Sequence, residues 1–208
     1  AEEDGQYGSI ASRYTKALAR SMASTKEIKA ANVLNNATTS TGGDGVTLLN
    51  TAHPTQNGNQ SNTLATAADL SETSLESILI QIADMKDDRG LRVAAQGTQL
   101  VIPTAYTFVA ERLLESQLRT GTADNDINAI KSGGYLPKGY HVMRRLTDAD
   151  AFFVTTDVPD GLKMFQRSAL KKGMEGDFET GNVRYKVRER YSFGVTDWRG
   201  IFGSEGAA

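Results

Sequence analysis

Residues that could bind a metal ion or a phosphate occur at two places, and both lack part of the required pattern. DNDIN at 124–128 begins like a calcium-binding loop, but its sixth position is Ala129 instead of glycine and its twelfth is Tyr135 instead of glutamate. Those two positions bend such a loop and complete the ligand shell of the ion. GGDG at 42–45 lacks the Lys-Ser/Thr ending of a phosphate-binding loop. We therefore expect a solvated loop and a flexible turn, with no metal and no cofactor.

Side chains that commonly act as acids, bases or nucleophiles are sparse. The chain has no cysteine, and its two histidines, His53 and His141, have no second histidine or carboxylate at ligand or triad spacing. We expect His53, ahead of a proline, in a turn and His141 on a strand. The carboxylate pair at 87–88 precedes Arg-Gly, a common surface turn. The sequence thus favours a protein that is not an enzyme, and a small hydrolase or metal-dependent enzyme is disfavoured.

A late segment has charged residues at regular spacing. Residues of a strand alternate between its two faces, so 182–195 is predicted to be a strand with one basic and one apolar face. We expect the apolar face to be buried and the basic face to meet a partner or water. The basic face carries Arg184, Lys186, Arg188 and Arg190, and the apolar face carries Val183, Tyr185, Val187, Tyr191, Phe193 and Val195.

Charge and hydropathy limit the partners of this basic face. The chain has a formal net charge of -2, whereas 163–199 hold nine Lys/Arg against five Asp/Glu, a local +4. A general nucleic-acid binder would be markedly basic, which this chain is not. A platform for single-stranded nucleic acid would place aromatic residues beside the cations, whereas here Tyr185, Tyr191 and Phe193 lie on the opposite face. Both kinds of nucleic-acid binder are therefore disfavoured. No apolar run approaches the roughly 20 residues of a membrane helix, and the first residues do not resemble a signal peptide. We expect no membrane partner.

The elements that would position these residues are helices first and strands later, which indicates an α+β fold. Two polar tracts, 36–63 and 118–135, interrupt them, and a tract as long as the first is expected to be functional or mobile. Three helices are predicted. The first spans 10–35, the second starts at a capping box formed by Thr73 and Glu76 and ends near Gly90, and the third spans 104–117. Strands are predicted at 98–103, 141–145, 151–156, 162–167 and 182–195.

Taken in order, these elements resemble the major capsid protein of tailed phages with the Hong Kong 97-like fold, specifically the Mu-like major head subunit family. The resemblance covers nearly the whole chain and rests on order and spacing. It is carried by the long first helix, LLNTAHPT, SLESILIQIADMKDDRG, LVIPTAYTFVAERLLES, YLPKGYHVMRRLTDADAFFVTTDVPDGLKMFQR and VRYKVRERYSFGVTDWRGIFG.

The resemblance implies a structural protein whose copies form hexamers and pentamers of an icosahedral shell around packaged double-stranded DNA. It implies a peripheral domain at 1–68 and 162–208, containing a spine helix at about 10–35, and an axial domain at 69–161. An N-terminal arm and extended loop, typical of the fold, are expected to be absent. The protein would be located in the virion, and in the host cytoplasm during assembly.

On this reading, Arg184, Lys186, Arg188 and Arg190 would face a neighbouring subunit or the genome. Two alternatives stay open. One is an encapsulin-like compartment shell protein, which would share the fold but enclose protein cargo. The other is a soluble adaptor domain, which would be monomeric.

Overall fold

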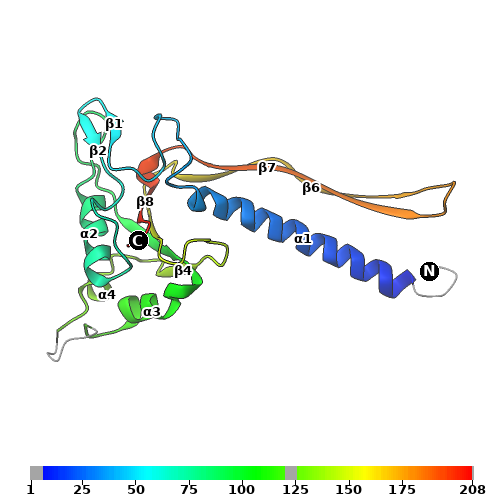
Figure 1. Cartoon of the computed structure of the whole chain (residues 1–208), viewed down its shortest axis with the longest axis horizontal. Coiled ribbons are helices and arrows are strands. Elements are labelled where there is room, and N and C mark those ends of the chain that lie inside the picture. The colour runs from blue at the N-terminus through cyan, green and yellow to red at the C-terminus, as the bar shows by residue number, and fades with distance from the viewer. Residues whose placement is uncertain (1–6, 120–125, 208) are drawn as a thin grey trace. The chain divides into compact units, whose positions relative to one another are not determined.

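The chain folds into a mixture of helices and strands, as the α+β prediction expects (Figure 1). The structure is a computed structural model and describes residues 7–119 and 126–207. The chain divides into two compact units. Unit 1 comprises Ala1–Ala30 and Met164–Phe193, and unit 2 comprises Ala31–Lys163 and Gly194–Ala208.

Unit 1 is built from most of a long helix and a long two-stranded ribbon. Helix α1 (Tyr7–Asn35) starts three residues before the predicted 10–35, and it contributes its residues up to Ala30 to this unit. Thr15, Leu18, Met22 and Lys26 are partly covered, whereas most positions between them are exposed. Their three- and four-residue spacing places them on one face of the helix.

Strands β6 (Leu162–Gly176) and β7 (Val183–Val195) pair as the ribbon. The predicted 182–195 strand is confirmed, and residues 162–167 form a strand as predicted, but this strand continues to Gly176, so its predicted end and the predicted turn near GMEGD are wrong. The turn lies later, where the Asp177 and Asn182 backbones are hydrogen-bonded and Gly181 has φ 66°. Pairing with β7 keeps β6 extended through Gly173, because a ladder of hydrogen bonds outweighs the weak strand preference of glycine.

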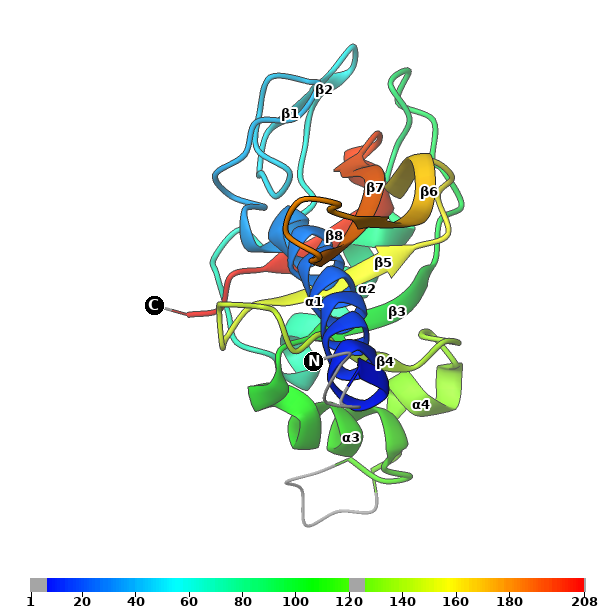
Figure 2. The ribbon, with the colours of Figure 1, turned by 90° about the vertical axis from the view of Figure 1, so that its right-hand side faces the viewer.

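Unit 2 contains a four-stranded sheet in the order β4-β3-β5-β8, which Figure 2 shows from β8 down to β4. Only the β3–β4 pair is parallel. The predicted strands at 98–103 and 151–156 are confirmed within a residue, and the one at 141–145 is shorter. The strands are β3 (Gly97–Ile102), β4 (Tyr140–Val142), β5 (Phe152–Thr156) and β8 (Ile201–Ser204).

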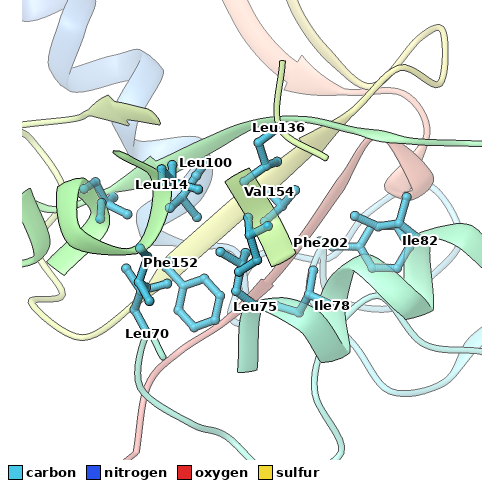
Figure 3. Packing of buried hydrophobic residues seen from close by; sticks show 14 of the residues in the cluster. Leu70, Leu75, Ile78, Ile82, Leu100, Leu114, Leu136, Phe152, Val154 and Phe202 are labelled. Atoms are coloured by element: carbon cyan, nitrogen blue, oxygen red, sulfur yellow. The ribbon is translucent and has the colours of Figure 1, made fainter. Parts of the chain in front are cut away.

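The sheet has an apolar core on each face. Leu100 pairs with Val154, and Val154 pairs with Phe202, so these three side chains share one face (Figure 3). Alternate residues such as Phe153 and Ile201 enter the second core on the other face. Burying each such side chain stabilises the fold by about 1.5–3 kcal/mol. A sheet covered on both faces explains why these short strands are apolar at consecutive positions.

Helices pack against the first core. Helix α2 (Glu72–Ala83) contributes Leu75, Ile78 and Ile82, and helix α3 (Thr107–Glu115), which follows a short 3-10 turn (Thr104–Tyr106), contributes Ala110, Leu113 and Leu114. Helix α4 (Ala129–Gly133) adds Ile130. The second core is formed by the end of α1 with Leu34, by Leu48 and Leu49, and by η2 (Trp198–Gly200).

The predicted boundaries of α2 are wrong at both ends. Its capping box is formed by Ser71 and Ser74, not by Thr73 and Glu76, and the helix stops at Ala83. After that point the Asp87 carboxylate accepts hydrogen bonds from the backbone of Arg89 and Leu91, which holds a turn. A carboxylate that captures nearby N–H groups competes with helix continuation, so the chain turns before Gly90.

The tract 36–63 is more ordered than its composition predicts. It contains a hairpin of β1 (His53–Thr55) and β2 (Gly58–Gln60), and its Leu48, Leu49, His53 and Asn62 are buried. A hydrogen bond from the Gln60 side chain to the Asp87 carbonyl joins the hairpin to the turn after α2. Polar side chains, which suggested a structureless loop, instead anchor it.

Candidate functional site

Strand β7 displays the four cations that the sequence singles out on one face. Arg184, Lys186, Arg188 and Arg190 are all exposed. Arg184 forms a loose ion pair with Asp177 at 3.7 Å. The other three form no ion pair with a described residue. We call Arg184, Lys186, Arg188 and Arg190 the cation row. Alternate residues of a strand lie about 7 Å apart, so the row spans roughly 20 Å of surface.

The opposite face of β7 is less buried than predicted. Val187, Tyr191, Phe193 and Val195 are partly covered, whereas Val183 and Tyr185 are exposed, so the prediction of a buried apolar face is wrong. The reason is the architecture of unit 1, in which a two-stranded ribbon is covered by one helix and not by a second sheet. A two-stranded ribbon with one helix beside it has too few neighbours to bury its apolar side chains along its whole length, so Val183 and Tyr185 stay exposed.

Glu189 lies on this partly covered face and is paired with helix α1. Its carboxylate is 2.6 Å from Lys26 Nζ, and its side chain is only 5% exposed. Lys26 also lies 5.2 Å from the centre of the Tyr191 ring, and Gln166 donates to the same carboxylate at 3.4 Å. This pairing explains how a carboxylate interrupts an otherwise apolar face, and it leaves Glu189 turned away from the cation row.

The end of the ribbon exposes large apolar side chains. Phe178, in the turn between the strands, is fully exposed, and Met174 is 66% exposed. Phe165 and Leu170 on β6 are also exposed. A run of exposed apolar residues on a monomer commonly marks a contact surface for another protein. The ribbon therefore presents both apolar residues and cations.

His53 is not the turn residue that the sequence suggests. It is fully buried on β1, with Nδ1 2.6 Å from the Asp44 carboxylate and Nε2 3.1 Å from Asn62 Oδ1. Asn62 Nδ2 donates to the Leu48 and Ile201 carbonyls, which fixes the orientation of the amide. Both ring nitrogens thus lie within hydrogen-bond distance of an oxygen atom. The arrangement joins the tract 36–63 to β8.

The remaining sequence candidates have structural roles. His141 lies on β4, which confirms the predicted strand position, and its side chain is exposed; Asp88 forms an ion pair with Arg199 at 2.5 Å. Positions 124–125 of the calcium-like segment lie outside the described residues. Asn128 is buried, not solvated, because it caps helix α4 and donates to the Leu113 carbonyl. An asparagine directly before a helical segment, a preferred N-cap residue, was the signal available for this cap.

The described residues contain no group of three or more histidine, aspartate or glutamate side chains that could hold a metal ion. A groove of about 670 Å³ lies between α2 and α4 and has Glu76 as its one ionisable carboxylate among apolar and small residues such as Leu79, Ile80 and Tyr135. No helix among the described residues is both long and apolar enough to cross a membrane. The part of the chain that the structure describes therefore shows surfaces for contact and no cluster of groups for catalysis.

Comparisons with known proteins agree with a contact role. A family model described as phage capsid protein matches residues 1–203. No curated protein matches the chain. A chain from a structure of Mycobacterium phage Che8 superposes with a TM-score of 0.51 at 16% identity, covering 96% of this chain and 66% of that one.

A chain from the capsid of an empty GTA particle, computed with C5 symmetry, gives a TM-score of 0.43 at 14% identity and covers 96% of this chain and 65% of that one. At these identities the likeness to the Che8 chain concerns the fold alone. This chain spans just under two thirds of the length of each of these solved chains.

Proposed function

The chain belongs to the phage capsid protein family, and on that premise we propose that it is a structural major capsid subunit whose copies build the shell of a virion. The observation that carries this proposal is the family match, which extends over residues 1–203 of the 208 in the chain. The family implies a structural rather than a catalytic role. The fold that this chain shares with the Che8 chain supports the proposal.

We propose further that the subunit has the Hong Kong 97-like fold of the Mu-like major head subunits. In this assignment 1–68 and 162–208 form the peripheral domain, and 69–161 form the axial domain. The long helix α1 and the β6–β7 ribbon of unit 1 support the assignment, since they fit a spine helix beside long peripheral strands. The sheet of unit 2 contributes strands to both proposed domains.

The proposed partners are other copies of the subunit, arranged as hexamers and pentamers, and double-stranded DNA enclosed by the shell. The cation row supports a polar contact with one of these partners, because three of its four members form no ion pair with a described residue. The exposed apolar residues of the ribbon, Phe178 and Met174 among them, support contact with other copies. Assembly would take place in the host cytoplasm.

Sedimentation of the protein expressed from its complete gene tests this function. The proposal expects particles far larger than a monomer, with nucleic acid inside them when the packaging proteins are present. Particles that instead enclose a defined protein cargo would identify an encapsulin-like compartment shell. A protein that stays monomeric at every concentration and ionic strength, even with any native scaffolding protein supplied, would indicate an adaptor domain and contradict the proposal.

A further inference from the structure

The two compact units carry opposite net charge. Unit 1 holds 12 Lys/Arg and 8 Asp/Glu, a net +4, whereas unit 2 holds 11 Lys/Arg and 17 Asp/Glu, a net -6. The two values add to the -2 of the whole chain. Since opposite charges steer and orient association, a chain divided in this way is suited to binding copies of itself head to tail.

The cation row is the clearest basic feature of unit 1. Lys186, Arg188 and Arg190 are exposed on one face of β7, and no carboxylate of the described residues lies within ion-pair distance of them. The one carboxylate within this stretch of β7, Glu189, is occupied by Lys26 on the other face. Apart from Arg184, which has its loose pair with Asp177, the row therefore presents its charge outward without a paired carboxylate among the described residues.

Unit 2 has a matching group of unpaired carboxylates, which we call the acid cluster: Asp69, Asp148, Asp150 and Glu205. All four are exposed, and none forms an ion pair with a described residue. Contacts along the chain hold them together. Asp69 accepts a hydrogen bond from the Ala207 backbone at 2.8 Å, Asp148 accepts one from the Asp150 backbone at 2.9 Å, and Asp148 and Glu205 line one small cavity.

The side chain of Tyr106 reports the same negative field. Its pKa is raised above the ordinary value of 10.0, first because of burial and then because of the charges of Asp69, Asp150 and Asp148. Three members of the acid cluster thus act on one point of the surface.

We propose that the cation row of one copy binds the acid cluster of a second copy. This inference rests on the proposed function and names the partner of the row. Four exposed cations face four exposed carboxylates of the same chain type, and such a contact joins two different surfaces. Contacts of that kind close into rings when the rotation between copies allows it, which is the geometry that a shell needs.

The charge balance favours a second copy over DNA as the partner. Duplex binding generally requires a markedly basic domain, because affinity comes from many neutralised phosphates. Unit 1 has 8 carboxylates in addition to its 12 cations, and the chain as a whole has a pI of about 5.8. A polyanion would be repelled by the rest of the chain, whereas the acid cluster offers a local match.

Two double variants of the full chain test the contact by exchanging its charges. Lys186→Glu with Arg188→Glu reverses part of the row, and Asp150→Lys with Glu205→Lys reverses part of the cluster. All four side chains are exposed, so the fold should be retained, as circular dichroism would verify. By sedimentation at low salt, each variant alone should associate at least about tenfold more weakly than the unmodified chain, because like charges would meet.

Sedimentation of a one-to-one mixture of the two variants is the decisive measurement. There the acidic row of one variant meets the basic cluster of the other, so association should return to within about threefold of the unmodified chain. Restoration in the mixture can arise only from contact between copies. At 1 M salt, where screening acts over about 3 Å, all of these differences should shrink.

Matched controls separate this contact from net charge. Arg13→Glu with Lys16→Glu, and Glu111→Lys with Asp126→Lys, change the charge of each unit by the same amount at other exposed positions. These controls should associate within about twofold of the unmodified chain. Controls that weaken association as strongly as the test variants would overturn the inference, as would a mixture without restoration.

A fluorescent duplex measures the DNA alternative. If reversing the row abolishes duplex binding and leaves self-association unchanged, the row binds the genome and the inference is overturned. Normal particles formed by either double variant alone would also overturn it, while the capsid function would stand. An unmodified protein that forms no particles would overturn both.

Discussion

The imidazole of His53 stacks on the indole of Trp198, with ring centroids 4.2 Å apart and ring planes 7° from parallel. The two rings come from distant parts of the chain, the tract 36–63 and the segment that precedes β8. Arg199 lies over the same indole at 4.6 Å. The hydrogen bonds of His53 with Asp44 and Asn62 complete a polar anchor that holds the tract on the sheet.

Removing this anchor should destabilise unit 2. We expect His53→Ala to lower the free energy of unfolding by about 2–4 kcal/mol, because it removes the contacts of the ring with the Asp44 carboxylate and with Asn62 Oδ1, removes the ring stacking and leaves a cavity. His141→Ala is the matched control, since His141 is exposed, and it should change stability by less than about 0.5 kcal/mol. Chemical denaturation of both variants measures the difference; equal midpoints would show that the anchor contributes little.

The Lys26–Glu189 pair should stabilise the packing of α1 on the ribbon. Lys26→Met would leave a nearly buried carboxylate with only the weaker Gln166 contact, so we expect a loss of about 1–3 kcal/mol. Lys29→Met removes an exposed lysine of the same helix and should cost under about 0.5 kcal/mol. If the double variant Lys26→Met with Glu189→Met is no more stable than Lys26→Met, the unpaired carboxylate is not the cause.

Gly200 and Gly161 lie back to back where the ribbon joins unit 2. A Cβ on Gly200 would come within 2.3 Å of the Gly161 Cα, so Gly200→Ala forces backbone to move. We expect it to lower the melting temperature by several degrees, corresponding to about 1–3 kcal/mol. Gly194→Ala, where nothing lies within 4 Å, is the control and should melt like the unmodified chain. A Gly200→Ala variant that also melts unchanged would disprove the close approach.

The acid cluster should act on the titration of Tyr106. Because the pKa of Tyr106 is raised in the folded chain, the unfolded chain loses the phenol proton at a lower pH than the folded chain does. The stability contributed by the neutral phenol is therefore fully present below pH 10.0 and is lost as pH rises through the folded pKa. Asp150→Asn removes one negative charge and should lower the Tyr106 pKa, as observed by NMR of labelled tyrosine. An unchanged titration would mean that Asp150 lies too far away to act.

Periodicity predicts α1 and β7, whose patterns of three- and four-residue spacing and of alternation run along the elements, and short consecutive apolar runs predict the buried sheet strands. It does not predict the length of β6, whose extension depends on pairing with β7, or the end of α2, where Asp87 captures backbone N–H groups. The buried positions of His53 and Asn62 depend on partners from other segments, so their polarity suggested a loop. The cation row was visible in sequence, whereas the acid cluster joins residues that only the fold brings together.

Electron microscopy of particles formed by the protein from its complete gene tests the central claim most directly. The account predicts closed icosahedral shells, in whose map α1, the β6–β7 ribbon and the four-stranded sheet of unit 2 fit each repeated position. Filaments, amorphous aggregates or dispersed monomers under every assembly condition, with native scaffolding protein supplied, would contradict it.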